Sequence, residues 1–437
     1  MFQAAARRSP DTVLLRYFDA ALTMSEVDEI SGALAAALVD RGFRVGDRTA
    51  VYLQNVPQFV LAMLGIWKAG GIMVPINPMN RERELEVILN DAGASTLVCE
   101  EMLYRDVAAA VLPKTSVRSV LTTSPLDYVT DPNPRVFGDM TRCRADGVDD
   151  LLEVAAEFRG RTPPADAGLR PDDTAFLVYT SGTTGPPKGA MNTHRNVVFN
   201  AQAYRDWMRL TPDDVVLGIA PLFHITGLIG HIALATLLPC PLVLAYRFEP
   251  EVILQETRDK GATFTIGAIT AFIALLNAPG AAREHLATLG KIYSGGAPIP
   301  PSTVASFRDL FGQYIHNIYG LTETTSPSHA APLDRPTPVD PDFGALSVGV
   351  PVPGHEQRVV DLETGAEVEP GELGELWTRG PGIVAGYWQR PEATAESITD
   401  GFLHTGDVGR VDEAGWFYLV DRLKDMINVS GYKVWPR

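Results

Sequence analysis

Strand and helix signals alternate along the first third of the sequence, and this alternation constrains the fold more strongly than any other feature. A capping box, in which Thr23 and Glu26 each cap the other's backbone N–H group, precedes apolar residues at helical spacing. Strands that alternate with helices in this way form a parallel sheet covered by helices. The expected elements are a helix at 23–42, a strand at 48–54, a helix at 57–70, a strand at 72–76, a helix at 82–92 and a strand at 96–99.

The rest of the sequence divides into segments of different character. Between residues 122 and 171 the periodicity degrades, apart from a short helical patch at 149–158, which is typical of a surface linker. The alternation resumes over 174–321, and short strands with Gly- and Pro-containing turns follow Pro332. We therefore expect an α/β fold with two doubly wound subdomains, helices on both faces of each sheet, and a small β-barrel-like subdomain. The expected units are 1–170 (an α/β subdomain with its linker), 171–331 (a second α/β subdomain), 332–420 (the β subdomain) and 421–437 (a terminal segment).

The chain is acidic. It carries 37 lysines and arginines against 53 aspartates and glutamates, a formal net charge of −16. This excess argues against nucleic acid and against an anionic membrane surface as main partners. It does not argue against an anionic small molecule, because a binding site is a local feature. Peripheral membrane contact and a homodimer both stay open.

Cysteine usage and the apolar segments bear on the compartment. Cys99, Cys143 and Cys240 are widely spaced without a C-x-x-C pair, which indicates reduced thiols and no metal site. The N-terminus lacks the apolar core of a signal peptide. Residues 227–246 are apolar enough to imitate a membrane span, but the helix-breaking Pro239 and its neighbours favour a buried helix, a turn and a strand at 242–245. We expect a soluble, cytoplasmic protein.

The stretch YTSGTTGPPKG, residues 179–189, begins where the apolar strand signal of 174–179 ends. Glycines let backbone N–H groups approach a ligand closely, while hydroxyls add donors and Lys188 adds a positive charge. This inventory favours an oxyanion such as a polyphosphate. The residues expected to hold it are Thr180, Ser181, Gly182, Thr183, Thr184, Gly185 and Lys188.

A Walker-type P-loop is an alternative interpretation of the same stretch. Such a loop requires Ser or Thr directly after Gly-Lys, followed by a helix. Here the order is Pro187, Lys188, Gly189, and residues 189–193 read as a returning strand. A P-loop NTPase is therefore the less favoured class.

Six motifs, taken together and in order, resemble the adenylate-forming superfamily of acyl-CoA synthetases, firefly luciferases and nonribosomal-peptide adenylation domains. The resemblance covers nearly the whole chain. Within this superfamily the sequence resembles the long-chain fatty-acid–CoA ligase branch, which implies ATP, Mg²⁺ and coenzyme A as cofactors. The motifs are YTSGTTGPPKG, PLFHITG (221–227), SGGAPI (294–299), YGLTE (319–323), HTGD (404–407) and DRLKDMINVSGYKVWPR (421–437).

The resemblance implies a role for each matching residue. Glu323 would hold Mg²⁺ against the triphosphate, Thr322 would contact the α-phosphate, and Tyr319 would stack on adenine. Asp407, assisted by Arg422, would bind the ribose hydroxyls. The implied catalytic residues are Thr180, Lys188, His224, Thr322 and Glu323, and the further nucleotide-binding residues are Gly295, Gly296, Ala297, Asn317, Tyr319, Gly320, Asp407 and Arg422.

The acyl pocket implied by the resemblance is apolar. Family members that activate amino acids carry an aspartate in the segment matching 221–227, and PLFHITG has no acidic residue. An apolar monocarboxylic acid fits best, with a fatty acid first and an aryl acid second. A nucleotide- and acyl-binding module without turnover is the alternative function. The implied pocket residues are His224, Ile225, Thr226, Leu228, Ile229, Gly267, Ala268 and Gly296.

In the family the chain continues into a mobile C-terminal lid domain, which here is expected to be largely absent. Lys424 matches the hinge about which that domain rotates, and Gly431 matches a glycine beside the thiol arm. The lysine that the lid normally supplies to adenylation lies outside this sequence. Residues 421–437 are thus interpreted as the hinge and the start of the lid.

Overall fold

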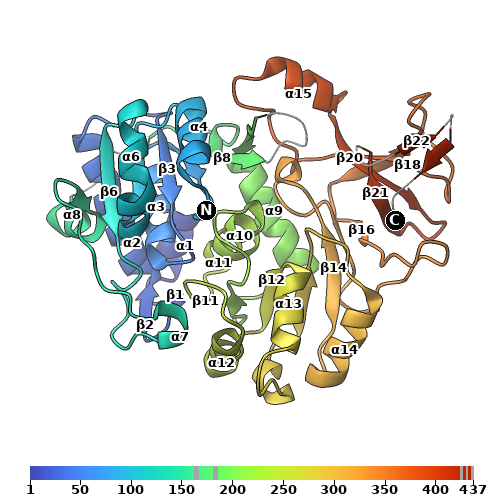
Figure 1. The fold of residues 1–437 in the computed structure, drawn as a ribbon, viewed down its shortest axis with the longest axis horizontal. Coiled ribbons are helices and arrows are strands. Elements are labelled where there is room, and N and C mark those ends of the chain that lie inside the picture. The colour runs from blue at the N-terminus through green and yellow to red at the C-terminus, as the bar shows by residue number, and fades with distance from the viewer. Residues whose placement is uncertain (162–166, 181–185, 424–426, 430–431, 435–437) are drawn as a thin grey trace.

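The computed structural model describes residues 1–161, 167–180, 186–423, 427–429 and 432–434, the last two ranges as backbone only. Two large, mainly parallel sheets stand side by side, and a small antiparallel sheet follows them (Figure 1). The mixed α/β class expected from the sequence is confirmed.

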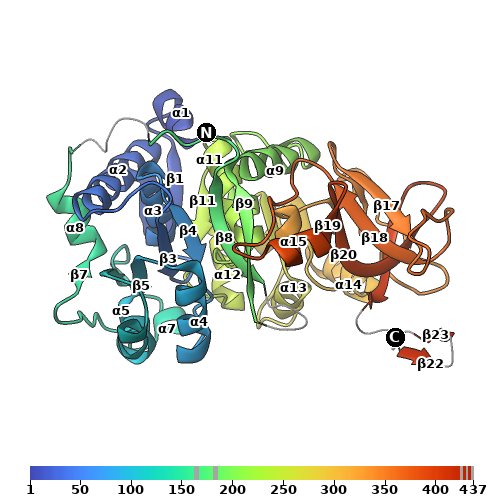
Figure 2. The same ribbon diagram turned by 90° about the horizontal axis from the view of Figure 1, so that it is seen from above.

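The first sheet contains seven strands in the order β7-β6-β5-β3-β4-β8-β9. Every neighbouring pair is parallel except β8 and β9, which form an antiparallel hairpin. Helices α2 (Met24–Asp40) and α3 (Pro57–Lys68) lie on one face, and α4 (Glu82–Ala92) lies on the other (Figure 2). The strands are β3 (Arg48–Tyr52), β4 (Ile72–Pro75), β5 (Thr96–Glu100), β6 (Ser119–Thr123), β7 (Asp149–Asp150), β8 (Thr174–Thr180) and β9 (Lys188–Thr193).

The second sheet contains nine strands in the order β16-β15-β14-β13-β12-β10-β11-β1-β2, parallel from β14 to β1. Its helices are α9 (His194–Trp207), α12 (Pro250–Lys260), α13 (Ile269–Leu276) and α14 (Pro301–Phe311). The strands are β1 (Val13–Tyr17), β2 (Ala20–Thr23), β10 (Val216–Leu217), β11 (Leu242–Leu244), β12 (Phe264–Gly267), β13 (Lys291–Ser294), β14 (Ile315–Tyr319), β15 (His329–Ala330) and β16 (Val350–Pro351).

The two large sheets exchange strands across the boundary expected at residues 170 and 171. β1 and β2 belong to the second sheet, because β1 pairs in parallel with β11. β8 and β9, which flank the glycine-rich loop, belong to the first sheet through the pairing of β8 with β4. The two described flanks of the loop, at Thr180 and Lys188, therefore belong to the first sheet.

The apolar segment 227–246 is buried between these layers. It forms α10 (Ile225–Gly227), a π-helix (Leu228–Ala233), α11 (Leu234–Leu237) and then β11, as the sequence predicts. Its residues His231 and Leu234 are fully buried. Among the described residues, no helix is long and apolar enough to cross a membrane.

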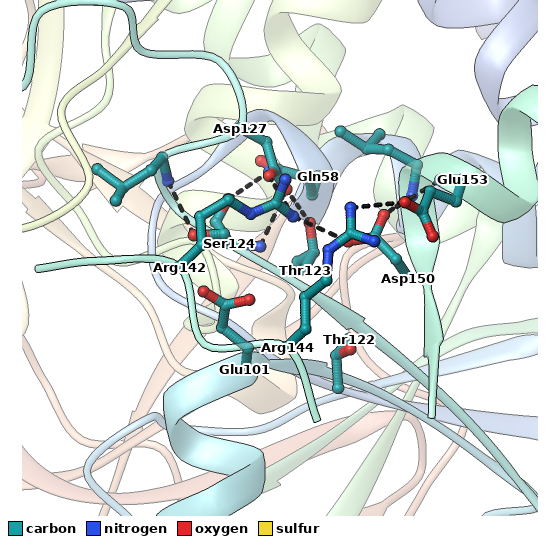
Figure 3. Close-up of polar contacts among 12 residues, drawn as sticks. Gln58, Glu101, Thr122, Thr123, Ser124, Asp127, Arg142, Arg144, Asp150 and Glu153 are labelled. Carbon is teal, nitrogen blue, oxygen red and sulfur yellow. Dashed lines mark hydrogen bonds and ion pairs between the residues drawn. The ribbon is translucent and has the colours of Figure 1, made fainter. Parts of the chain in front are cut away.

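Ion pairs and hydrogen bonds hold part of the segment 122–171, which the sequence pattern predicts to be a surface linker. Figure 3 shows Arg142 between two carboxylates, its Nη2 lying 2.7 Å from Asp127 Oδ1 and 2.9 Å from Asp150 Oδ2. Asp127 Oδ2 also accepts hydrogen bonds from Ser124 N and from Gln58 Nε2 of α3. The described part of this segment around Asp127 is thereby held against α3, which covers the first sheet. The helices of this region are α5 (Glu101–Leu103), a π-helix (Tyr104–Ala108), α6 (Ala109–Val111), α7 (Pro134–Phe137) and α8 (Leu151–Glu157), and α1 (Phe2–Arg8) opens the chain.

The small sheet is antiparallel, in the order β17-β18-β20-β19 with β21 also paired to β20. Its core side chains include Val359, Leu376 and Phe417, which pack against Tyr319 at the end of β14. This packing brings the small sheet to the edge of the second large sheet. The elements are β17 (Glu356–Val360), β18 (Gly374–Arg379), α15 (Pro391–Ser397), β19 (Ile398–Thr399), β20 (Phe402–Val411) and β21 (Phe417–Arg422), with a separate hairpin of β22 (Ile427–Val429) and β23 (Tyr432–Val434).

Candidate active site

The β8–β9 hairpin presents the two ends of the glycine-rich loop. Thr180 and Lys188 are paired across the hairpin, so the described flanks of the loop are held in register. Lys188 begins a strand and not a helix, as the sequence predicts. A P-loop requires a helix directly after its lysine, so this backbone does not have P-loop geometry. Five of the predicted phosphate-binding residues and both hinge residues lie outside the described residues: Ser181, Gly182, Thr183, Thr184, Gly185, Lys424 and Gly431.

Side chains from neighbouring elements brace this hairpin. The Tyr179 hydroxyl donates to Asp91 Oδ2 of α4 over 2.7 Å, and Arg390 pairs with the other oxygen of the same carboxylate. Gly189 faces the Tyr179 ring, where an added Cβ would lie 3.1 Å from Cζ. The base of the loop is therefore fixed by close packing as well as by strand pairing.

Thr322 and Glu323 lie in a short 3₁₀-helix (Thr322–Thr324) directly after β14. The turn that follows is unusual, because Thr325 (φ 55°) and Ser326 (φ 73°) both adopt left-handed backbone conformations without being glycine. Asn200 Nδ2 donates to the carbonyls of Thr324 and Thr325, each over 2.7 Å. The structure thus stabilises a strained turn at the predicted metal carboxylate.

Asn192 of β9 reaches the same turn from the hairpin. Its Nδ2 donates to Thr322 O over 3.0 Å and to Thr325 Oγ1 over 2.9 Å. Asn192 and Asn200 are both fully buried. The two amides therefore connect the hairpin and α9 to the predicted catalytic turn.

We call residues 380–390 the strap, because this segment leaves the small sheet and runs back along β9. Met191 N donates to Gly386 O over 2.9 Å, and Trp388 N donates to Gly189 O over 2.8 Å. On its other side, Val384 N donates to Glu323 O over 3.0 Å. The strap consequently joins the hairpin to the predicted catalytic turn.

Tyr387 of the strap brings Lys188 and Glu323 together. Its hydroxyl donates to Glu323 Oε1 over 2.7 Å, and Lys188 Nζ lies over its ring, 5.2 Å from the centroid. The pKa of Tyr387 is raised by burial and by the Glu323 charge, so the phenol remains a donor. Lys188, the predicted phosphate-loop lysine, and Glu323, the predicted metal ligand, therefore both contact the same side chain, that of Tyr387.

Tyr319, Asp407 and Arg422 also converge. The Tyr319 hydroxyl donates to Asp407 Oδ2 over 2.6 Å, and Arg422 Nε lies 3.1 Å from Asp407 Oδ1. Burial and the Asp407 charge raise the pKa of Tyr319. The HTGD segment that presents Asp407 lies within β20, where Gly406 N donates to Glu375 Oε1 of β18 over 2.9 Å.

The segment Gly295, Gly296 and Ala297 follows β13, beside β14. A Cβ on Gly295 would lie 2.5 Å from Ile318 O, so this position requires close backbone approach, whereas Gly296 (φ 80°) opens onto free space. The Asn317 side chain is buried, and its Nδ2 donates to Ser347 O over 2.8 Å. Gly320 is similarly confined, since a Cβ there would lie 2.6 Å from Ser326 O.

The predicted acyl-pocket residues lie at the C-terminal end of β12, after β13, and from His224 through α10 into the π-helix that follows it. His224 is exposed, yet desolvation by the surrounding protein lowers its pKa. Gly295 N donates to Gly267 O over 3.3 Å, which places a predicted pocket residue next to a predicted nucleotide residue. The side chains of Ile225, Leu228 and Ile229 are buried, whereas Thr226 is partly exposed and Ala268 is exposed.

Asn55 positions the chain that leads to His224. It lies between β3 and α3, and its Nδ2 donates to Gly218 O and Ala220 O while its Oδ1 accepts from Leu222 N. His231 Nε2 accepts a further hydrogen bond from Ala220 N over 3.1 Å. The loop before the acyl pocket is therefore held from two directions.

The described residues contain no cluster of three or more potential metal-ligating side chains. Glu323 is partly exposed, and its carboxylate is the hard oxygen ligand that Mg²⁺ prefers. Because Mg²⁺ commonly takes one or two carboxylates together with phosphate oxygens, a single glutamate fits a metal that arrives with a nucleotide.

Sequence reasoning missed Asn55, Asp91, Asn192, Asn200 and Tyr387. One signal was present for part of this set: asparagines recur at every fourth residue from Asn192 to Asn200 among apolar neighbours. This spacing places Asn196 and Asn200 on one face of α9, whereas Asn192 lies in β9. Asn55, Asp91 and Tyr387 carry no comparable local signal, because their partners are distant in sequence.

Comparison with known proteins agrees with this geometry. The sequence matches the AMP-binding enzyme family over residues 2–388. The chain is 36% identical over 449 residues to a long-chain-fatty-acid–CoA ligase of Escherichia coli O157:H7, covering 100% of this chain and 78% of the relative. It is 34% identical to a feruloyl-CoA synthase of Amycolatopsis, covering 99% and 79%. The structure of ATP-bound MatB from Rhodopseudomonas palustris superposes with a TM-score of 0.83 at 30% identity, covering 99% of this chain and 81% of that one.

The fold and the order of the site motifs thus define an adenylate-forming acid–CoA ligase. The chain belongs to the AMP-binding enzyme family, whose members use ATP and coenzyme A.

Proposed function

We propose that this protein activates a fatty acid by transferring it to AMP with release of pyrophosphate, and then passes the acyl group to coenzyme A. The observation that carries the proposal is the convergence of Lys188 and Glu323 on Tyr387, at the mouth of the β8–β9 hairpin. The Lys188 ammonium group suits a phosphate oxygen, and the Glu323 carboxylate suits the cation that accompanies a triphosphate.

The chemistry explains why both groups are needed. A carboxylate must approach an α-phosphate although both are anionic, and each pair of charges at about 4 Å repels by roughly 4 kcal/mol at an effective dielectric constant of about 20. Mg²⁺, when bound, would neutralise phosphate charge. Lys188, Thr180 and Thr322 would hold the phosphates through charge and hydroxyl donors, and Glu323 would keep the cation in place.

The nucleoside would lie toward the small sheet. Asp407 would accept hydrogen bonds from the ribose hydroxyls, since a carboxylate is a strong acceptor, and Arg422 would assist it. Tyr319 would present its ring to adenine. Asn317 would receive the adenine amino group through its side-chain oxygen, because its nitrogen is already bound to Ser347 O. Gly296 would let the base approach the backbone.

The acid would be apolar. The segment 221–227 contains no acidic side chain that could pair with an ammonium group, and Ile225, Leu228 and Ile229 behind it are buried and apolar. His224 would face the reacting carboxylate as a neutral imidazole, because its pKa is lowered. The similarity to a feruloyl-CoA synthase favours an aryl acid as the second candidate.

The test is ATP–pyrophosphate exchange with a panel of medium-chain, long-chain, aryl and amino acids. We expect exchange with fatty acids, weaker exchange with aryl acids and none with amino acids. The variant Glu323→Ala should lose Mg²⁺-dependent exchange while keeping the melting temperature of the parent. Exchange restricted to aryl acids would replace the fatty-acid assignment, and ATP binding without exchange for any acid would refute the proposed activity.

A further inference from the structure

Tyr387 is held by main-chain contacts on both sides of its side chain. Toward the hairpin, Tyr387 forms an antiparallel bridge with Ala190, and Trp388 N donates to Gly189 O. Toward the catalytic turn, Val384 N donates to Glu323 O over 3.0 Å. The residue therefore has a fixed place between two elements whose site residues are Lys188 and Glu323.

The Tyr387 side chain contacts each of these residues through a different part. Tyr387 is 9% exposed and its side chain packs with Ala190 and Val384, so the orientation of the ring is set by burial. Its face lies under Lys188 Nζ, a cation–π contact with a distance of 5.2 Å to the centroid. Its hydroxyl donates to Glu323 Oε1 over 2.7 Å.

We propose that Tyr387 is a positioning residue for Mg²⁺–ATP, which fixes the Glu323 carboxylate and keeps Lys188 from forming an ion pair with it. This inference rests on the proposed function. A direct pair between the lysine and the glutamate would neutralise both groups that must meet the metal and the phosphates. The tyrosine gives each group a partner without removing its charge. Among the described residues, only one of the two Glu323 carboxylate oxygens, Oε1, accepts a side-chain hydrogen bond.

The test compares ATP binding by the wild type and by Tyr387→Phe, using calorimetry with Mg²⁺ and with EDTA. Phenylalanine keeps the ring beneath Lys188 and removes only the hydroxyl. We expect the gain in ATP affinity due to Mg²⁺ to fall about tenfold, the scale of a hydrogen bond to a charged group. ATP binding in EDTA should change less than twofold, since Glu323 then has no metal to hold.

Tyr418→Phe is the matched control, because that tyrosine also donates to a carboxylate, Asp412 Oδ2, over 3.0 Å within the small sheet. It should leave both affinities unchanged. A second variant, Tyr387→Leu, also removes the ring and should weaken ATP binding in EDTA as well, because Lys188 is then released to pair with Glu323.

The outcomes separate the positioning role from the proposed function. If Tyr387→Phe keeps the full Mg²⁺ effect on ATP affinity, the positioning role is wrong, whatever the exchange activity. If it lowers affinity equally with Mg²⁺ and with EDTA, the residue serves structure only and the inference also fails. If the wild type shows the Mg²⁺ effect but no pyrophosphate exchange, the proposed function fails while the role of Tyr387 in metal–nucleotide binding is still decided by the variants.

Discussion

The hydroxyl of Tyr319 donates a 2.6 Å hydrogen bond to Asp407, which joins the last parallel strand of the second sheet to the central strand of the small sheet. Both side chains are buried, at 8% and 4% exposure. A carboxylate in such surroundings needs strong donors, and Arg422 is the second one. The proposed ribose ligand is thus also the group that fastens the small sheet to the nucleotide site.

Replacing Tyr319 with phenylalanine should therefore cost stability before it costs nucleotide binding. The change deprives a buried carboxylate of one donor, and we expect the free energy of unfolding to fall by about 2 kcal/mol. Tyr293→Phe is the control, since that hydroxyl donates to a neutral carbonyl, Ala331 O, over 3.1 Å, and should cost about 1 kcal/mol. Urea denaturation measures both, and equal losses would contradict the special role of Asp407.

Asp407→Asn tests the proposed contact to ribose. The amide keeps a side-chain oxygen that can accept from Tyr319 but loses the charge that strengthens acceptance from hydroxyl donors. We expect the affinity for ATP to fall at least about tenfold. The affinity for inorganic pyrophosphate should stay unchanged, because that ligand has no ribose. A parallel loss for both ligands, measured by calorimetry, would show a general disturbance of the site instead.

Much of the fold follows from local sequence, and much of the site does not. The capping box of Thr23 and Glu26 forms as predicted, and the helix expected at 82–92 has those bounds, because both depend on residues a few positions apart. The returning strand after Lys188 is also confirmed. In contrast, the pairing of β1 with β11 joins segments more than 200 residues apart, and no local pattern selects it.

The candidate site likewise combines residues that sequence motifs predict with residues that only the three-dimensional packing reveals. Motif order predicts Lys188, Glu323, Tyr319 and Asp407 as site residues. The structure places Lys188 and Glu323 on either side of Tyr387, and Tyr319 beside Asp407. Tyr387 was not predicted, since its contact to Glu323 spans 64 residues and a tyrosine in a turn-rich segment has no distinguishing feature. Side-chain partners of this kind are set by packing between elements, which a single sequence does not encode in any periodicity.

Asn200 should be essential to the turn at residues 322–326, which carries the predicted metal ligand Glu323. Alanine at this position leaves two buried carbonyls, those of Thr324 and Thr325, without their donor beside left-handed residues. We expect a loss of about 2–3 kcal/mol in the free energy of unfolding, together with weaker Mg²⁺–ATP binding. Asn277→Ala provides the comparison, because its exposed amide bonds only to Ile273 O of its own helix and should change stability by less than about 0.5 kcal/mol.

The ion pairs in Figure 3 predict a second stability effect, remote from the site. Arg142→Met would leave Asp127 and Asp150, whose side chains are 3% and 9% exposed, without their shared cation. We expect a loss of about 1–3 kcal/mol, reduced from that of a fully buried pair because Arg142 itself is 40% exposed. Arg135→Met, which removes an exposed pair with Glu251, should cost less than about 1 kcal/mol. Similar losses for the two variants would refute the distinction.

Buried histidines should make the protein sensitive to mild acid, and His231 is the clearest case. It is fully buried, and desolvation lowers its pKa to about 4. An unfolded histidine has a pKa of about 6.5, so between these values the unfolded chain binds the proton and the folded chain does not. The stability that His231 contributes is therefore present above about pH 6.5 and is lost as the pH falls toward 4, at up to about 1.4 kcal/mol per pH unit.

His231→Gln isolates this effect, since a glutamine carbonyl can accept from Ala220 N without titrating. The wild type should lose about 2 kcal/mol more than the variant between pH 6.5 and pH 5 in urea denaturation. Comparing the two chains also cancels Glu100, whose raised pKa works in the opposite direction by favouring the folded state as the pH falls. If both chains lose stability equally over this range, the acid sensitivity arises elsewhere and His231 is protonated without cost in the folded protein.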